Sequence, residues 1–149
     1  SLAICEYLED IQPEPPLLPG SALERAKIRA MALAVACEIH PLNNLRVLRY
    51  LVKELGQTEE AKNTWYRHWV EQGLAAIEDR LLAEGRTGRY ALGDRVTLAD
   101  VLIVPQIFNA QRMNSRLDHV PAIMRIFEHC MQLPAFVEAQ PSKQPDAEP

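Results

Sequence analysis

The sequence predicts an all-α protein, a bundle of about five or six helices. Apolar residues recur at intervals of three and four along most of the chain, the spacing that places them on one face of a helix. Two segments carry the capping-box pattern that begins helices, and no alternating strand pattern appears after residue 20. Apolar residues make up 48% of the 149 positions, which suffices for the core of one domain.

The first twenty residues divide into a helix and a linker. Ser1–Asp10 carries an apolar stripe of roughly helical period and is predicted to be an amphipathic helix. Residues 12–20 hold four prolines and end in a glycine, so they cannot continue the helix and are typical of a linker. Because the chain opens directly into helical sequence, we expect residues 1–11 to close an upstream domain that the chain otherwise lacks.

A capping box at Ser21 and Glu24 begins the next helix, since the two side chains can satisfy free backbone N–H groups reciprocally. Pro41 must kink or break this helix, because proline has no N–H to donate and its ring crowds the preceding turn. Helical sequence resumes through Leu55, and Gly56 suits the position just after a helix end.

Thr58 can cap the following helix, and Gly85 ends it. After a loop, Thr97 and Asp100 form a second capping box, which opens a wholly apolar helix that runs to about Arg112. We interpret Thr97 and Asp100 as structural residues, since the loss of such a cap typically costs about 1 kcal/mol.

Two prolines mark the last helices. Pro121 suits the first turn of one helix, and Pro134 opens a short final one. Residues 141–149 contain three prolines and few large apolar groups, so we expect an extended tail. The helical domain is therefore expected to span residues 21–140.

Composition excludes several classes of protein. Sixteen basic and twenty acidic side chains give a net charge of −4, which argues against a nucleic-acid binder. No apolar run approaches the ~18 residues that a membrane span needs, so no membrane partner is expected. Three widely spaced cysteines indicate buried free thiols in a reducing cytoplasm. The histidines lack the spacing of metal ligands, so no metal site is predicted.

Several motifs resemble one family. The stretch Gly93–Asp100 resembles the segment that opens the buried central helix of the glutathione transferase C-terminal domain. Residues 39–45, 104–106, 109–112 and 143–146 resemble segments of the zeta class, which contains maleylacetoacetate isomerase. The resemblance covers essentially the whole chain, in order.

The resemblance implies an enzyme fold and a reaction. Residues 1–11 are then the last helix of a thioredoxin-like domain, and the rest is the all-helical C-terminal domain of the glutathione transferase fold. The implied activity is the glutathione-dependent cis–trans isomerisation of maleylacetoacetate to fumarylacetoacetate, by reversible addition of a thiolate. The resemblance also implies glutathione as the cofactor, a small diacid as the substrate and a homodimer. The thiol-activating residue is expected in the missing upstream half.

Two candidate site residues follow from the resemblance and from chemistry. Ser1 matches the family's serine that holds the γ-glutamyl carboxylate of glutathione, and a helix N-terminus favours such an anion; the alternative is an ordinary N-cap serine. Arg112 can bind a substrate carboxylate through two parallel hydrogen bonds. The alternative for Arg112 is a solvated surface arginine or a structural ion pair.

Three further candidates lie around the proline. His40 and Asn44 flank Pro41, where a broken helix can direct side chains into a cleft, and we expect them to contact glutathione. The alternative for His40 is a histidine that ends a helix by binding a carbonyl. Arg46, which follows the bend, is a second candidate for a substrate carboxylate. An aromatic group on the Thr58 helix, Trp65, Tyr66 and Trp69, is expected to pack in the core.

Other functions remain open. Maleylpyruvate isomerase uses the same thiol chemistry on a shorter diacid. A general glutathione S-transferase reaction, conjugation or dehalogenation, would use the same pocket. A third alternative is a non-catalytic helical module for protein interaction.

Overall fold

Helices account for nearly all the regular structure in the computed structural model, which describes residues 2–147. No β-strand occurs in this range, in agreement with the predicted all-α class. The α-helices are α1 Leu2–Ile11, α2 Ala22–Leu33, α3 Leu45–Lys53, α4 Glu59–Glu84, α5 Leu98–Arg112, α6 Pro121–Cys130 and α7 Pro134–Glu138. A π-helix, η1 Ala34–Ile39, and two 3₁₀ turns, η2 His40–Asn43 and η3 Pro141–Lys143, complete the set.

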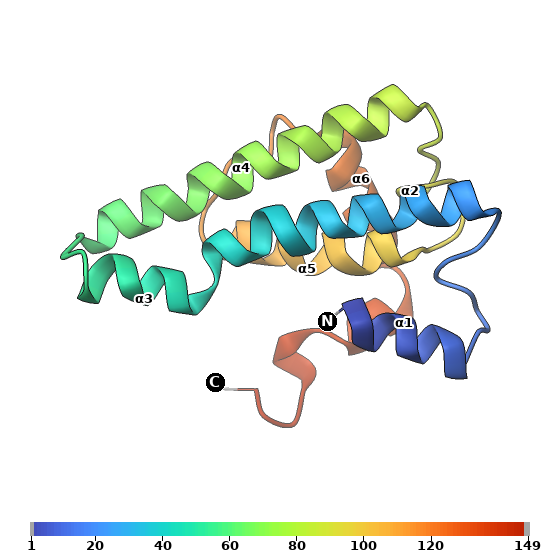
Figure 1. Ribbon diagram of the computed structural model, residues 1–149, viewed down its shortest axis with the longest axis horizontal. Coiled ribbons are helices and arrows are strands. Elements are labelled where there is room, and N and C mark those ends of the chain that lie inside the picture. Colours follow the sequence, from blue (N-terminus) through green and yellow to red (C-terminus); the bar gives the residue numbers. More distant parts are fainter. Residues whose placement is uncertain (1, 148–149) are drawn as a thin grey trace.

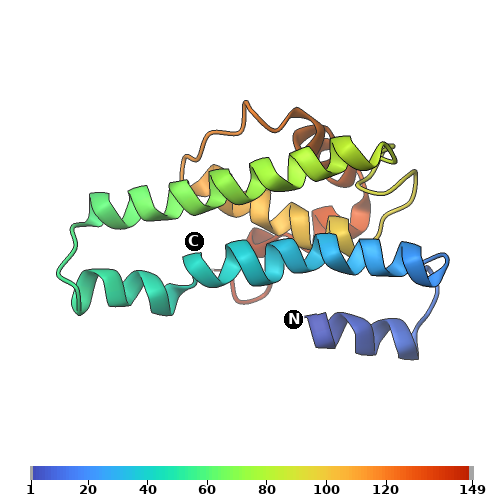
Figure 2. The ribbon, with the colours of Figure 1, turned by 45° about the horizontal axis from the view of Figure 1, so that its top comes forward.

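Helix α5 forms the interior of the bundle. It packs against α2, η1 and α6, whereas α4 packs against η1, η2, α3 and α6. Figures 1 and 2 show α2 and α4 running along α5, with α3 folded back beside the start of α4. The face of α5 that carries Ile103 and Ile107 is fully buried against these neighbours, whereas Phe108 on another face is 39% exposed.

The core consists of aliphatic side chains that the helical period brings to one face. On α4, Val70, Leu74 and Ile77 are at most 1% exposed, and on α5 Ile103 and Ile107 are fully buried. Full burial of such a side chain contributes about 1.5–3 kcal/mol of transfer free energy. The predicted spacing on the Thr58 helix therefore identified its buried face correctly.

The predicted caps are present. The Glu24 carboxylate accepts the Ser21 N–H at 2.8 Å, and the Ser21 hydroxyl accepts the Glu24 N–H at 3.3 Å. The Thr58 hydroxyl accepts an N–H of the first turn of α4 at 3.1 Å. Gly56 and Gly85 both adopt positive φ, 63° and 61°, which a residue without a side chain tolerates best.

The second capping pair is buried. The Asp100 carboxylate accepts the N–H and the hydroxyl of Thr97 at 2.8 and 2.9 Å, and the N–H of Ala91 at 2.8 Å. Asp100 is fully buried and Thr97 is 1% exposed. Burial raises the pKa of Asp100 above its ordinary value, although these hydrogen bonds oppose the rise.

A further helix cap, at the start of α6, has no local signature in the sequence. Glu78, in the middle of α4, is 4% exposed, and its carboxylate accepts the N–H groups of Ala122 at 2.8 Å and Ile123 at 2.9 Å. A carboxylate at a helix N-terminus satisfies free donors and interacts favourably with the helix dipole. Glu78 thus fastens the start of α6 to α4, 44 residues away along the chain.

Two helix ends differ from the prediction. The α-helical hydrogen bonding of α2 stops at Leu33, before the proline, and the chain continues as the π-helix η1. The extra residue per turn of a π-helix accommodates the strain that the proline ring imposes on the turn before it. Helix α3 ends at Lys53, two residues earlier than Leu55.

Helix α1 lies along one side of the bundle (Figure 1). The Glu9 carboxylate holds it there by accepting the N–H groups of Leu17 and Leu18 at 2.8 and 2.9 Å. No residue of α1 is buried, and Ile4 and Tyr7 are more than 60% exposed. Within residues 2–147, the apolar face of α1 is therefore largely uncovered.

The cysteines are free, but the prediction that all are buried was wrong. Cys130 is buried, Cys5 is partly buried, and Cys37 is exposed on η1. In the described range, no cluster of side chains could hold a metal ion. Among the same residues, no helix is both long enough and apolar enough to cross a bilayer.

Candidate functional site

The bend between α2 and α3 carries most of the predicted site residues. The His40 N–H donates to the Val35 carbonyl, a π-type bond, and η2 begins at His40. The imidazole of His40 is exposed at this bend. Asn44 follows η2 and caps α3, because its side-chain oxygen accepts the Arg46 N–H at 3.1 Å.

In this position, the side chains of Asn44 and Arg46 both keep N–H groups that could donate hydrogen bonds to a ligand. The Asn44 oxygen serves the helix cap, so its amide NH₂ is the part that can contact a ligand. Arg46 lies in the first turn of α3, and its side chain is exposed. No carboxylate among residues 2–147 forms an ion pair with Arg46.

Helix α4 holds the bend in place through three contacts. The Trp65 indole N–H donates to the Leu42 carbonyl at 2.9 Å, and the Asn43 amide donates to the Tyr66 carbonyl at 3.3 Å. Two turns further along α4, Gly73 faces Ile39 so closely that an added Cβ would lie 2.3 Å from Ile39 Cγ1.

Arg112, the last residue of α5, lies near the same part of α4. Its guanidinium is exposed, and no carboxylate in residues 2–147 pairs with it. Burial raises the pKa of Tyr66, and the positive charge of nearby Arg112 opposes that rise. Because Tyr66 also accepts the hydrogen bond from Asn43, Arg112 and the bend approach a common residue, in line with the contact between α5 and η1.

Ser1 lies outside the described residues. Helix α1, which follows it, begins at the end that is directed toward the bend, as both ribbon views show (Figures 1 and 2). The expected packing role of the aromatic group holds for Tyr66, which is 5% exposed. Trp65 and Trp69 are partly buried and meet edge to face, with ring centroids 5.6 Å apart.

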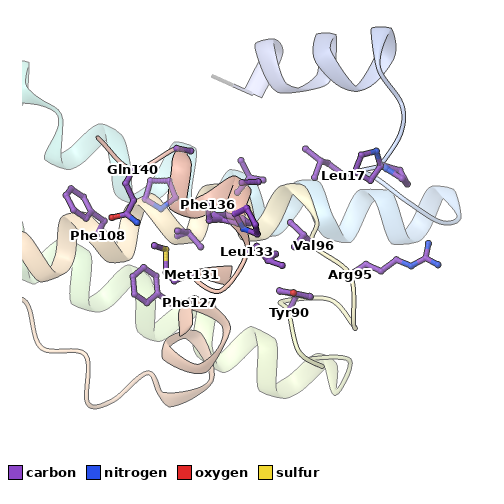
Figure 3. A pocket seen from close by; sticks show the side chains of 18 of the residues that line it. Leu17, Tyr90, Arg95, Val96, Phe108, Phe127, Met131, Leu133, Phe136 and Gln140 are labelled. Atoms are coloured by element: carbon purple, nitrogen blue, oxygen red, sulfur yellow. The ribbon is translucent and has the colours of Figure 1, made fainter. Parts of the chain in front are cut away.

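A large apolar groove was not expected from the sequence. A cavity of about 1050 Å³ lies between the proline-rich segment, the outer face of α5, the end of α6 and the chain around α7. Figure 3 shows Phe108, Phe127, Met131 and Phe136 toward one part of the groove, while Leu17 lies at the other. The groove is hydrophobic, with few polar groups at its rim.

Of the predicted site residues that the structure describes, none lines this groove. Gln111 does, and it is the sequence neighbour of Arg112. The sequence did contain a signal for it. Val101, Val104 and Phe108 repeat at helical spacing on α5, on a face other than that of the fully buried Ile103 and Ile107, so a second apolar face needed a cover.

Comparison with known proteins gives this geometry a context. Residues 44–134 match the family described as glutathione S-transferase, C-terminal domain. A probable maleylacetoacetate isomerase from Vibrio cholerae is 44% identical over 147 residues, which cover 99% of this chain and 67% of that protein. The chain thus spans about two thirds of the length of that relative.

Two solved structures extend the comparison. One is the holo structure of a bacterial maleyl pyruvate isomerase, a zeta-class glutathione S-transferase. It superposes with a TM-score of 0.95 at 43% identity, and the match covers 99% of this chain and 69% of that protein's chain. The other is a maleylacetoacetate isomerase from Anaeromyxobacter dehalogenans with dicarboxyethyl glutathione and citrate in its active site. Its TM-score is 0.92 at 39% identity, covering 99% of this chain and 65% of its own.

Proposed function

Because this chain belongs to the glutathione S-transferase family, and to its zeta class, we propose that the protein isomerises maleylacetoacetate to fumarylacetoacetate with glutathione as cofactor. The observation that carries the proposal is the exposed guanidinium of Arg112, which has no carboxylate partner in residues 2–147. Burial raises the pKa of Tyr66, whose backbone carbonyl accepts the hydrogen bond from the bend, and the charge of Arg112 opposes that rise. An arginine without a partner beside a potential glutathione site suits a dicarboxylic substrate.

The reaction needs a nucleophile that can leave again. Bound glutathione would supply a thiolate that adds reversibly to the cis C=C bond, so that this bond would be single while it rotates; nothing would be oxidised or reduced and no proton would be consumed overall.

The residues of this chain would bind and orient the reactants. Arg112 would bind one substrate carboxylate, and Arg46 is the second candidate for that role. His40 and the free amide of Asn44 would contact glutathione across the bend. Ser1 would hold the γ-glutamyl carboxylate at the start of α1, where free backbone N–H groups favour an anion.

We place the residue that activates the thiol outside these 149 residues. About a third of the Vibrio cholerae relative has no counterpart in this chain. A thioredoxin-like domain that ends in α1 would cover the exposed face of α1 and provide the other wall of the glutathione site. The proposed assembly is a homodimer, and the exposed apolar side chains of α3, Leu45 and Tyr50, are candidates for its interface. Free cysteines suit the cytoplasm.

The test uses the full-length protein with maleylacetoacetate, maleylpyruvate and a small haloacid, each with glutathione. We expect isomerisation of the first acid. Arg112→Ala should lower kcat/KM about 10–100-fold, the size of one lost charge-assisted interaction. Arg125→Ala, an exposed arginine on α6 with no ion pair in the described range, is the matched control and should change nothing.

The alternatives give different results. Isomerisation of maleylpyruvate alone would reassign the substrate, and activity on the haloacid alone would indicate a general transferase. A protein that is inactive on all three acids and is not retained on immobilised glutathione would be a non-catalytic interaction module. Equal activity of the Arg112 and Arg125 variants would remove Arg112 from the substrate site.

A further inference from the structure

We propose that Trp65 and Asn43 are positioning residues for glutathione, which act by holding the α2–α3 bend against α4. This inference rests on the proposed function, because it assumes that glutathione contacts the bend. Neither residue was a predicted site residue, and neither need touch the ligand. Both are identified by the hydrogen bonds that join η2 to α4.

The bend cannot hold its own shape as an α-helix does. Regular i→i−4 bonding ends at Leu33, and a π-helix and a 3₁₀ turn follow in succession. Pro41 has no N–H, and both irregular helices have poorer hydrogen-bond geometry than an α-helix. The conformation of this segment must therefore be fixed by contacts from elsewhere in the fold.

Helix α4 supplies those contacts at both ends of the bend. At the start, Ile39 lies against Gly73, where the absence of a side chain permits the close approach. At the end, the Leu42 carbonyl accepts the Trp65 N–H, and the Asn43 amide donates to a carbonyl of α4. The two ends are fixed by positions two turns apart on one rigid helix.

The candidate glutathione contacts lie between and just after these points. His40 falls inside the fixed segment, and Asn44 follows Asn43 directly. Their positions relative to Arg112 therefore depend on the contacts from α4. A small displacement of the bend would weaken the binding of a ligand that contacts both the bend and Arg112, without altering any group that reacts.

The two tryptophans of the chain provide a matched pair of variants. The Trp65 N–H donates to Leu42 at 2.9 Å, whereas the buried Trp69 N–H has no acceptor among residues 2–147. Replacing either with phenylalanine keeps an aromatic ring and removes the N–H. Only Trp65→Phe therefore removes a bond to the bend.

The experiment measures the Kd of glutathione by calorimetry, together with kcat and the KM for glutathione, on the full-length protein. Trp65→Phe should raise Kd and KM for glutathione about 3–10-fold and change kcat less than twofold, as the loss of one neutral hydrogen bond predicts. Trp69→Phe should leave all three unchanged. A merely structural role would instead lower thermal stability without separating KM from kcat.

Asn43→Leu is an independent second variant. It removes the amide N–H that donates to α4. It also removes a buried Asn43 oxygen that has no partner in the described residues, and because that oxygen destabilises the fold, its loss should offset the lost hydrogen bond and folding should be largely retained. It should raise Kd in the same way as Trp65→Phe. Equal Kd in the Trp65, Trp69 and wild-type proteins would overturn the inference. A wild-type protein that binds no glutathione would instead overturn the proposed function.

Discussion

Replacing Asp100 with alanine would leave two buried backbone N–H groups without an acceptor, that of Thr97 at the start of α5 and that of Ala91 in the preceding loop. The Asp100 carboxylate accepts the N–H of Ala91 and the N–H and hydroxyl of Thr97, all within 2.9 Å. Asp100 and Ala91 are fully buried and Thr97 is 1% exposed, so water cannot replace the lost oxygen atoms.

The cost follows from this count of donors. Each of the two buried backbone N–H groups left without a partner costs about 1–3 kcal/mol, so their loss alone should lower the free energy of unfolding of Asp100→Ala by about 2–6 kcal/mol. A domain of this size has about 5–15 kcal/mol in total. Asp100→Asn, which keeps one acceptor oxygen, should fall between alanine and the wild type.

Urea unfolding of the full-length protein, followed by the fluorescence of Trp65 and Trp69 on α4, measures the change in the helical domain. Thr58→Ala is the control, because Thr58 caps α4 at an exposed position and its loss should cost about 0.5–2 kcal/mol. The reasoning would be refuted if Asp100→Ala cost no more than Thr58→Ala, since burial would then make no difference to a cap.

Three further predictions concern α4, α2 and the cysteines. Gly73→Ala should lower the free energy of unfolding by about 1–3 kcal/mol in urea titrations, because its Cβ would lie 2.3 Å from the isoleucine side chain that ends η1; unchanged stability would mean that the contact relaxes freely. The hydrogen bond from Arg86, and to a smaller extent those from the capping serine, lower the pKa of Glu24 to about 2. The ionised Glu24 carboxylate therefore contributes its full stabilisation above pH 4.5, and this contribution is lost as the pH falls toward 2. The difference in Tm between the wild type and Glu24→Gln should shrink over that interval, and a constant difference would contradict this origin. Iodoacetamide should label exposed Cys37 in the native protein but not Cys130, because burial raises the pKa of Cys130 to about 12. Peptide mass spectrometry would detect the labelled cysteines, and equal labelling of the two would show that α6 opens readily.

Local sequence patterns were sufficient for most helix boundaries. The caps at Ser21, Thr58 and Thr97 involve residues at most three positions apart, and the glycine after α4 acts on its own turn. Interactions of such short range can be read from neighbouring residues, because the chain itself brings the partners together. The family resemblance likewise rested on short continuous segments.

The same locality explains the errors. The sequence identified Pro41 as the cause of a break but placed the break at the proline itself. The π-helix begins seven residues earlier, at Ala34, and its last residue, Ile39, packs against Gly73 of α4. The cap that Glu78 gives to α6 joins positions 44 residues apart, and no local pattern marks it.

For the candidate site, the sequence alone identified side chains with suitable chemistry, namely His40, Asn44, Arg46 and Arg112, and a family in which such groups have a use. Only the tertiary structure decided that Arg112 and the bend both act on Tyr66, that the Asn44 oxygen is committed to capping α3, and that an apolar groove forms which includes Gln111. The reason is physical: charge and hydrogen-bonding capacity belong to individual residues, whereas proximity depends on how helices far apart in the chain pack together.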